Sequence, residues 1–216
     1  MHIAMLLYPN MTTLDFVGPY EVFSFIPDAN VIPVARQPGV IRVDAGHHLF
    51  NADRTLDDVE QADIVFVPGS ANNAHVLADE SVLDWIRCVD AGSRWTTSVC
   101  TGSLILAAAG LLNGVRSTTH WAAMEALRSY GATPVRERTV TDGKYMTGAG
   151  VSAGIDLALI LAEAVAGEAV ARAIQLSIEY DPRPPFRAGS FADATDEMIE
   201  MSLGLLARRS RMALRT

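Results

Sequence analysis

The chain has 216 residues, half of them apolar, and a formal net charge of −8. This length and composition suit one compact domain with its own core, and the acidic balance argues against binding to a phosphate backbone. The two cysteines are too few for a disulfide framework, and no apolar run reaches the ~18 residues of a membrane span. The N-terminus lacks the basic start of a signal peptide. We therefore expect a cytoplasmic protein that binds neither nucleic acid nor membrane.

Strand-like and helical patterns alternate along the chain. In order, the first half predicts a strand over 3–9, a helix over 14–25, strands over 30–39 and 62–69, a helix over 76–92 and a strand over 95–100. The second half predicts a helix over 101–112, a short strand over 114–120, a helix over 122–131, two strands joined by an Asp-Gly turn within 133–150, and helices over 151–167 and about 195–210. This alternation predicts a single doubly wound α/β domain over residues 1–216, with a mostly parallel sheet.

In a doubly wound sheet, ligands bind beyond the carboxyl ends of the strands. The run ADIVFVPG at 62–69 lacks polar alternation, which is typical of a strand covered on both faces. Three notable sequences fall at or just past such strand ends: SVCTG, VPGS and TTLDFVGP. The sequence therefore predicts that these three segments meet in one site.

The stretch SVCTG, which contains Cys100, has the form of a nucleophile elbow between a strand and a helix. A thiol at a helix N-terminus faces unpaired N–H groups, so we expect its pKa to be lowered and its thiolate to be nucleophilic. The alternative is a small buried core residue. Cys88 lies on an amphipathic helical pattern, where packing is the better interpretation.

The turn VPGS lets the chain approach a ligand closely at Gly69. Its N–H groups at Gly69 and Ser70, with the N–H of Thr101, could form an oxyanion pocket facing Cys100. An ordinary strand-to-helix turn is an equally good interpretation of these residues taken alone.

Asp15 is an acid at an apolar helix start, where helix capping is the commoner role. Beside a thiol in an apolar pocket, however, its pKa would be raised and the two groups would titrate as a pair. His120 could pair with Cys100 or serve as a structural histidine. His47 and His48 are adjacent but have no further ligand at metal spacing, so no metal site is expected.

Five stretches, TLDFVGPYEVF, the VPG turn, TSVCTGSLILAAAGLL, STTHW and QLSIEYDPRPPFRAGS, together resemble the isonitrile hydratases. These enzymes form part of the PfpI-type branch of the class I glutamine amidotransferase-like superfamily. The resemblance implies a flavodoxin-like three-layer sandwich, a homodimer and no cofactor. It also implies that Cys100 is the nucleophile, Asp15 the acid and base, and Thr101 a hydrogen-bonding partner near Asp15. Ser70 departs from the Pro-Gly-Gly turn of many relatives.

The resemblance implies hydration of an uncharged isonitrile to an N-formamide through a covalent thioimidate. Phe16, Val17 and Trp121 could line an uncharged pocket, but they could equally be core residues. Two other functions stay open: a ligand-sensing domain like the sensor half of AraC-type regulators, and a glyoxalase-like or deglycase enzyme. A glutaminase triad is disfavoured, because no histidine follows His120.

Overall fold

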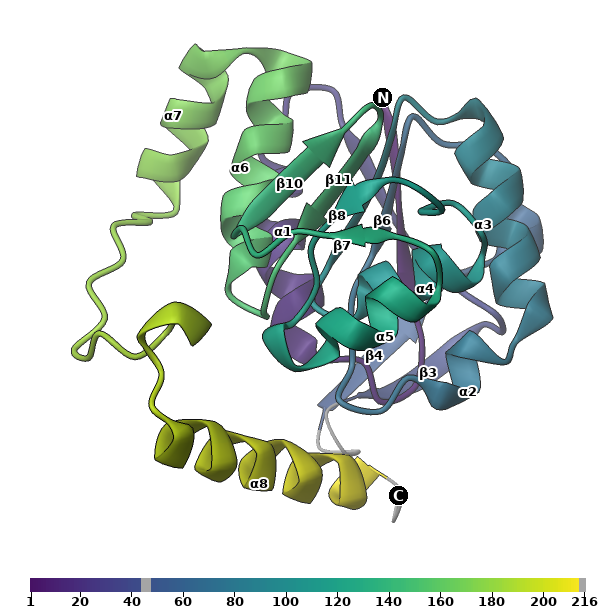
Figure 1. Cartoon of the computed structure of the whole chain (residues 1–216). Coiled ribbons are helices and arrows are strands. Elements are labelled where there is room, and N and C mark those ends of the chain that lie inside the picture. Colours follow the sequence, from purple (N-terminus) through teal and green to yellow (C-terminus); the bar gives the residue numbers. More distant parts are fainter. Residues whose placement is uncertain (44–47, 214–216) are drawn as a thin grey trace.

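The computed structural model describes residues 1–43 and 48–213 (Figure 1). His47, one of the two adjacent histidines of the sequence, lies outside the described residues. None of the described helices is long and apolar enough to cross a membrane.

A seven-stranded sheet in the order β10-β11-β7-β6-β1-β2-β5 forms the centre of the molecule. Its strands are β1 (His2–Leu7), β2 (Asn30–Ala35), β5 (Arg54–Thr55), β6 (Ile64–Val67), β7 (Trp95–Val99), β10 (Thr139–Asp142) and β11 (Tyr145–Gly148). All these neighbours pair in parallel except β10 and β11, which form an antiparallel hairpin closed at the predicted Asp-Gly turn. The prediction of a mostly parallel sheet is confirmed.

Helices cover both faces of the sheet (Figure 1). One layer contains α1 (Thr13–Ser24), α6 (Ala153–Ala166) and α7 (Glu168–Ser177), and the other contains α2 (Ala74–Leu77), α3 (Glu80–Gly92), α4 (Gly102–Ala108) and α5 (Met124–Ser129). Every residue of β6 is buried, as expected for a parallel strand covered on both sides. The three-layer sandwich that the resemblance implied is confirmed.

Short elements complete the chain. They are the hairpin of β3 (Gly39–Val43) and β4 (His48–Ala52), the pair of β8 (Arg116–Ser117) and β9 (Thr133–Pro134), and the 3-10 helices η2 (Leu56–Asp58), η3 (Trp121–Ala123) and η4 (Phe191–Asp193). The sequence did not predict the β3–β4 hairpin or α7. The predicted helix over 76–92 is divided, because Asp79 caps a new helix by accepting the N–H of Ser81.

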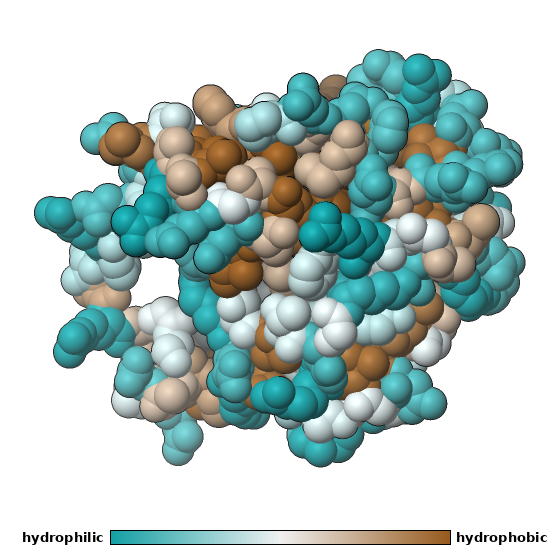
Figure 2. Space-filling view, turned by 90° about the horizontal axis from the view of Figure 1, so that it is seen from above, coloured by the Kyte–Doolittle hydropathy of each residue, from teal (hydrophilic) through white to brown (hydrophobic). Residues whose placement is uncertain are grey.

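The last helix, α8 (Asp196–Ala213), confirms the prediction for this region. It is reached through an exposed segment over residues 179–195, which we call the arm. The arm leaves α7, runs away from the body and brings α8 beneath the carboxyl ends of the strands (Figure 1). Seen from above, the molecule has an opening between its left-hand part, where the arm runs, and its body (Figure 2).

Candidate active site

Cys100 lies between the end of β7 and the start of α4, in the left-handed region with φ of +56°. Its N–H donates to the carbonyls of Ala149 (2.7 Å) and Gly148 (3.1 Å). Its own carbonyl accepts the hydroxyls of Thr119 (2.9 Å) and Ser103 (3.2 Å). A non-glycine residue in this conformation costs about 1–3 kcal/mol, and such strain is typical of functional turns held by their surroundings. Cys100 therefore has the backbone of a nucleophile elbow.

Two glycines allow this turn to pack against the neighbouring strand end. A Cβ atom on Gly102 would lie 2.1 Å from the carbonyl oxygen of Val67. A Cβ atom on Gly69 would lie 2.5 Å from the nitrogen of Thr101 and 2.9 Å from the Cβ of Cys100. Both contacts are too short for any side chain, so the close approach of the VPGS and SVCTG turns depends on these glycines.

Asp15 is fully buried in the first turn of α1 and contacts the thiol of Cys100 through a hydrogen bond and through its charge. Its Oδ2 accepts the N–H of Gly69 at 2.9 Å. The helix cap is Thr12 rather than Asp15, and the N–H of Thr12 donates to the carbonyl of Gly69 (2.8 Å). The structure thus brings the three predicted segments together and gives Asp15 a partner beyond its own helix.

The surroundings of Cys100 correct the expectation of a lowered thiol pKa. Burial and then the charge of Asp15 raise the pKa of Cys100 well above its ordinary value, while hydrogen bonds from Thr101 lower it less. The prediction from the helix N-terminus was wrong because desolvation and a neighbouring carboxylate outweigh the helix dipole. The charge of Asp15 therefore favours the protonated, thiol form of Cys100.

Tyr8 is a third titratable group of this site that the sequence did not single out. It is buried at the end of β1, and its hydroxyl donates to the carbonyl of Pro68 at 2.8 Å. Burial, followed by the charges of Asp15 and Cys100, raises the pKa of Tyr8 well above its ordinary value. Its place directly after the first strand was the available signal, because that strand also ends at the ligand edge.

Two of the three N–H groups predicted for an oxyanion pocket, those of Gly69 and Ser70, have other partners. The N–H of Gly69 binds Asp15, and the N–H of Ser70 donates to the hydroxyl of Thr101 at 2.9 Å. That hydroxyl in turn donates to the carbonyl of Ser70 at 2.7 Å. The N–H of Thr101 instead hydrogen-bonds with Cys100 and lowers its pKa. The VPGS turn therefore positions Asp15 and Thr101.

Ser70, which departs from the Pro-Gly-Gly turn that the resemblance implied, fits without strain because its φ is not in the left-handed region. Its hydroxyl donates to the carbonyl of Asn10 (2.6 Å) and accepts the N–H of Asn72 (2.9 Å). The side chain thus fastens the loop after β1 to the loop after β6.

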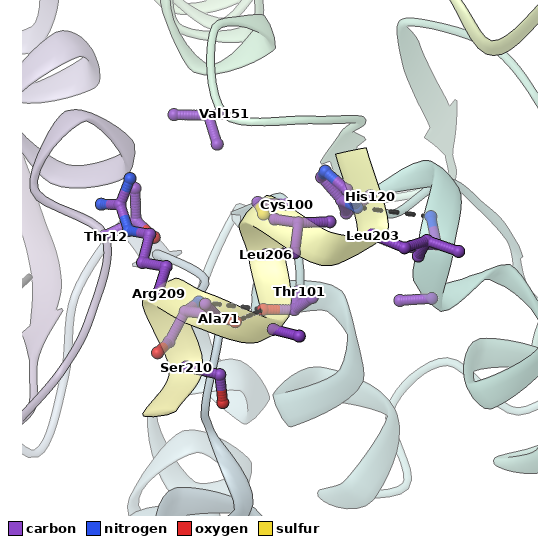
Figure 3. A pocket seen from close by; sticks show the side chains of 14 residues that line it. Thr12, Ala71, Cys100, Thr101, His120, Val151, Leu203, Leu206, Arg209 and Ser210 are labelled. Atoms are coloured by element: carbon purple, nitrogen blue, oxygen red, sulfur yellow. Dashed lines mark hydrogen bonds between the residues drawn. The ribbon is translucent and has the colours of Figure 1, made fainter. Parts of the chain in front are cut away.

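Cys100 opens onto a cavity of about 350 Å³ (Figure 3). Its lining consists of Thr12, Ser70, Ala71, Cys100, Thr101, His120, Ala122, Ala123, Val151, Leu203, Leu206, Ala207, Arg209 and Ser210. Burial lowers the pKa of His120, whose Nδ1 accepts the N–H of Ala122 at 3.3 Å. This contact caps η3 and favours the structural interpretation of His120 over a Cys–His pair.

Three residues considered for the pocket lie elsewhere. Trp121 stacks on Phe191 with ring centroids 5.5 Å apart, and Phe16 packs in the core against Phe50. Val17 is half-buried against the same core. Among residues 1–43 and 48–213, no three His, Cys, Asp or Glu side chains are placed to hold a metal ion.

The chain resembles several known proteins. It is 42% identical to an isonitrile hydratase of Pseudomonas putida over 93% of this chain and 87% of that one. It is 33% identical to the HTH-type transcriptional regulator CdhR of Pseudomonas aeruginosa over 60% of this chain and 38% of that one. The crystal structure of a THiJ/PfpI family protein from Pseudomonas syringae superimposes with a TM-score of 0.91 and 36% identity, over 98% of this chain and 88% of that one.

Residues 1–164, which include β1, the Cys100 turn and Asp15, match the model of the DJ-1/PfpI family. The match covers most of the chain, and the protein from Pseudomonas syringae shares its fold. The protein is a member of the DJ-1/PfpI family.

Proposed function

We propose that this protein hydrates isonitriles to N-substituted formamides, with Cys100 as the nucleophile and Asp15 as the acid and base. The observation that carries this proposal is the contact between a buried carboxyl and a thiol that lines a cavity. The 42% identity to an isonitrile hydratase over nearly the full chain supports the choice of substrate. The covalent step needs a nucleophile and a proton donor at one carbon atom, and this pair supplies both.

In the first half of the reaction, the proton of the Cys100 thiol passes to Asp15 as the sulfur attacks the terminal carbon of R–N≡C. A carbon–sulfur bond forms, and Asp15 returns the proton to that carbon. The product is the thioimidate R–N=CH–S–Cys100, which contains all atoms of the thiol and the isonitrile. The N–H of Thr101, which hydrogen-bonds with Cys100, stabilises the sulfur while it carries negative charge.

In the second half, Asp15 takes a proton from a water molecule as its oxygen attacks the thioimidate carbon. Asp15 gives this proton to the nitrogen, which yields the tetrahedral intermediate R–NH–CH(OH)–S–Cys100. As the carbon–sulfur bond breaks, Asp15 takes the hydroxyl proton and passes it to the leaving sulfur, and R–NH–CHO is released. One water is consumed in total, and Cys100 and Asp15 return to their starting protonation states.

The direct test is the formation of formamide from tert-butyl isonitrile, followed by proton NMR. Turnover that needs both Cys100 and Asp15 supports the proposal. Lactate formation from methylglyoxal with isonitriles inert would replace it with the glyoxalase-like alternative.

A ligand-sensing role is a second candidate, favoured by the similarity to the HTH-type transcriptional regulator CdhR of Pseudomonas aeruginosa. The chain spans 38% of that regulator. A sensor would bind an isonitrile or another small molecule without converting it. Saturable binding measured by calorimetry, with no formamide after prolonged incubation, would select this candidate.

We also propose a homodimer and a cytoplasmic location. Leu176 on α7 is 80% exposed and Leu14 on α1 is also exposed, so apolar side chains lie on the surface of the α1–α6–α7 layer. Both cysteines are free thiols, which fits a reducing compartment. Light scattering coupled to size-exclusion chromatography gives the mass directly, and a monomer at micromolar concentration would contradict the dimer.

A further inference from the structure

One face of α8 takes part in the cavity of Cys100, although α8 is far from the other site residues in sequence. Leu203, Leu206, Ala207 and Ser210 all line the cavity. Figure 3 shows Leu203, Leu206 and Ser210 beside it. The four residues follow the i, i+3, i+4, i+7 spacing of residues that share one side of a helix. One face of α8, defined by these four residues, is therefore turned towards the cavity that contains the thiol.

This wall of the cavity is apolar at Leu203, Leu206 and Ala207, while Arg209 and Ser210 add polar groups at the far end of the helix. Leu203 and Leu206 contribute the largest hydrocarbon groups among the α8 residues that line it. Val151, Ala122 and Ala123 add further apolar lining from the body of the domain. The polar groups next to Cys100 come from the loops at the strand ends, where its partners lie.

The arm that carries α8 is attached to the body near its far end by Phe191. The ring of Phe191 stacks on Trp121 with centroids 5.5 Å apart and an interplanar angle of 27°. The guanidinium of Arg136 lies over the same ring, 4.3 Å from its centroid. A ring held by an aromatic partner and a cation is a specific attachment.

The start of the arm is attached as well. Tyr180 hydrogen-bonds with Asp156 of α6, which also forms an ion pair with Arg138. The carbonyl of Tyr180 accepts the side-chain amide of Gln175 at 3.0 Å. The arm is thus tied to its own domain at both ends, and its second attachment lies five residues before α8 begins.

We infer that Leu203 and Leu206 determine substrate specificity by limiting the size of the isonitrile R group, and that Phe191 is a positioning residue for this wall. The inference rests on the proposed function, in which the isonitrile carbon binds to the sulfur of Cys100. The R group then extends from the thiol into the space bounded by α8. The cavity volume of about 350 Å³ is at the small end of ligand pockets, which favours compact alkyl or aryl groups.

The wall is tested by comparing kcat/KM for isopropyl isonitrile and for 1-naphthyl isonitrile. In Leu206→Ala the ratio of naphthyl to isopropyl rises by about tenfold or more, because a few carbon atoms in an apolar pocket change selectivity by that order. The matched control is Leu205→Ala, since Leu205 is on the same helix, is 63% exposed and does not line the cavity. Equal ratios in Leu206→Ala and Leu205→Ala would overturn the inference.

Phe191 is tested by its effect on selectivity. Phe191→Ala removes the contact with Trp121 and Arg136. The naphthyl-to-isopropyl ratio of kcat/KM then rises because KM for the naphthyl substrate falls, while kcat for isopropyl isonitrile stays within about twofold of the parent. Phe191→Tyr keeps an aromatic ring between Trp121 and Arg136 and therefore restores the parental ratio. A ratio that is unchanged in Phe191→Ala removes its positioning role.

A second readout keeps this test separate from the proposed function. Alkylation of Cys100 at pH 8.5 is followed by peptide mass spectrometry with iodoacetamide and with N-(1-pyrenyl)maleimide, and the exposed Cys88 is the reference thiol in each reaction. In Leu206→Ala the rate of Cys100 alkylation by the pyrenyl maleimide rises relative to the rate with iodoacetamide, whereas in Leu205→Ala it does not. If isonitriles are not hydrated but this ratio of alkylation rates changes, only the proposed function fails. An unchanged ratio of alkylation rates, or no alkylation of Cys100 by either reagent, overturns the inference that α8 limits access to the thiol.

Discussion

Two buried carboxyls, Asp15 and Asp90, lie at opposite ends of the central sheet in different surroundings. Asp90 accepts the hydroxyl of Thr96 at 2.6 Å and lies 3.0 Å from the ammonium of Lys144. Asp15 accepts the N–H of Gly69 and contacts the thiol of Cys100. An ammonium compensates the charge of Asp90 and ties α3 to the hairpin of β10 and β11. Asp15 faces a group with which it can exchange a proton, so burial alone does not separate a structural acid from a reactive one.

The backbone at the two ends differs in the same way. At the carboxyl end, a Cβ atom on Gly69 would collide with the nitrogen of Thr101. At the amino end, a Cβ atom on Gly92, close to Asp90, would meet nothing within 4 Å. The backbone thus leaves no space for a side chain at Gly69, whereas it does at Gly92. The same substitution can therefore be compared at the two ends of the sheet, in Asp15 and Asp90 and in Gly69 and Gly92.

The largest expected effect separates the two acids by activity. Asp15→Asn removes the proton carrier and lowers kcat by about 10²- to 10⁴-fold, the usual contribution of general acid–base catalysis. Asp90→Asn, assayed under identical conditions with tert-butyl isonitrile, keeps kcat within about twofold. Comparable losses in both variants would mean that Asp15 acts only through folding.

The second effect concerns the glycines. Gly69→Ala forces the VPGS and SVCTG turns apart, which lowers kcat/KM by at least about tenfold and lowers the melting temperature, because an overpacked backbone contact costs ~1–3 kcal/mol. Gly92→Ala changes neither quantity appreciably, since its Cβ atom enters open space. Steady-state kinetics and differential scanning calorimetry on the two variants check both statements. Full activity in Gly69→Ala would show that the close approach is not needed.

The third effect is a pH shift in thiol reactivity. The charge of Asp15 raises the pKa of Cys100, second only to burial, so the thiolate fraction grows as the pH rises towards that raised pKa. Asp15→Asn removes this charge and moves the rise of iodoacetamide labelling at Cys100 to lower pH, while Asp90→Asn leaves the profile in place. At a fixed pH below the midpoint, Asp15→Asn is therefore labelled severalfold faster even though its turnover is slower. A shift of the labelling profile to higher pH in Asp15→Asn would contradict the effect of Asp15 on the pKa of Cys100.

The smallest effect concerns stability. Asp90→Asn loses its ion pair with the partly exposed Lys144 but keeps an acceptor for Thr96, and we expect it to reduce the free energy of unfolding by about 1–2 kcal/mol. Asp15→Asn keeps an acceptor for the N–H of Gly69 and changes this free energy by less. Urea unfolding followed by circular dichroism compares the two, and a larger loss in Asp15→Asn would reverse the assignment of structural and reactive acids.

Much of the site could be predicted because its parts lie at strand ends. Buried runs with no polar alternation mark β1 and β6, and each is followed by a short sequence of distinctive composition. A parallel sheet brings such ends to one edge, so the meeting of Cys100, Asp15 and Gly69 follows from topology. The positive φ of Cys100 follows from the elbow pattern between a strand and a helix.

Other features depend on tertiary contacts that leave little trace in local sequence. The pKa of Cys100 is set by burial and by a carboxylate 85 positions away in the chain. The N–H groups of Gly69 and Ser70 are occupied by partners from α1 and from the Thr101 turn, which the VPGS pattern does not reveal. Trp121 stacks on the arm, and α8 reaches the cavity through a long exposed segment. The sequence pattern of an exposed segment does not indicate where it leads in space.

The β3–β4 hairpin and α7 were missed for local reasons. Val40 of the hairpin is 63% exposed while Val43 is buried, so the strand signal is alternating and weak within a polar stretch. Gly167, with φ of +88°, separates α7 from α6 where the apolar pattern of α6 ends. Short amphipathic elements of this kind are stabilised by packing more than by their own propensity.

Steady-state turnover by Cys100→Ala tests the role of this thiol most directly. With tert-butyl isonitrile as substrate, the variant is expected to fold, because alanine also fits the space of the buried thiol, and to form formamide at least about 10³-fold more slowly than the parent protein. Formamide production at the parental rate by a folded Cys100→Ala protein would contradict a covalent reaction at this sulfur.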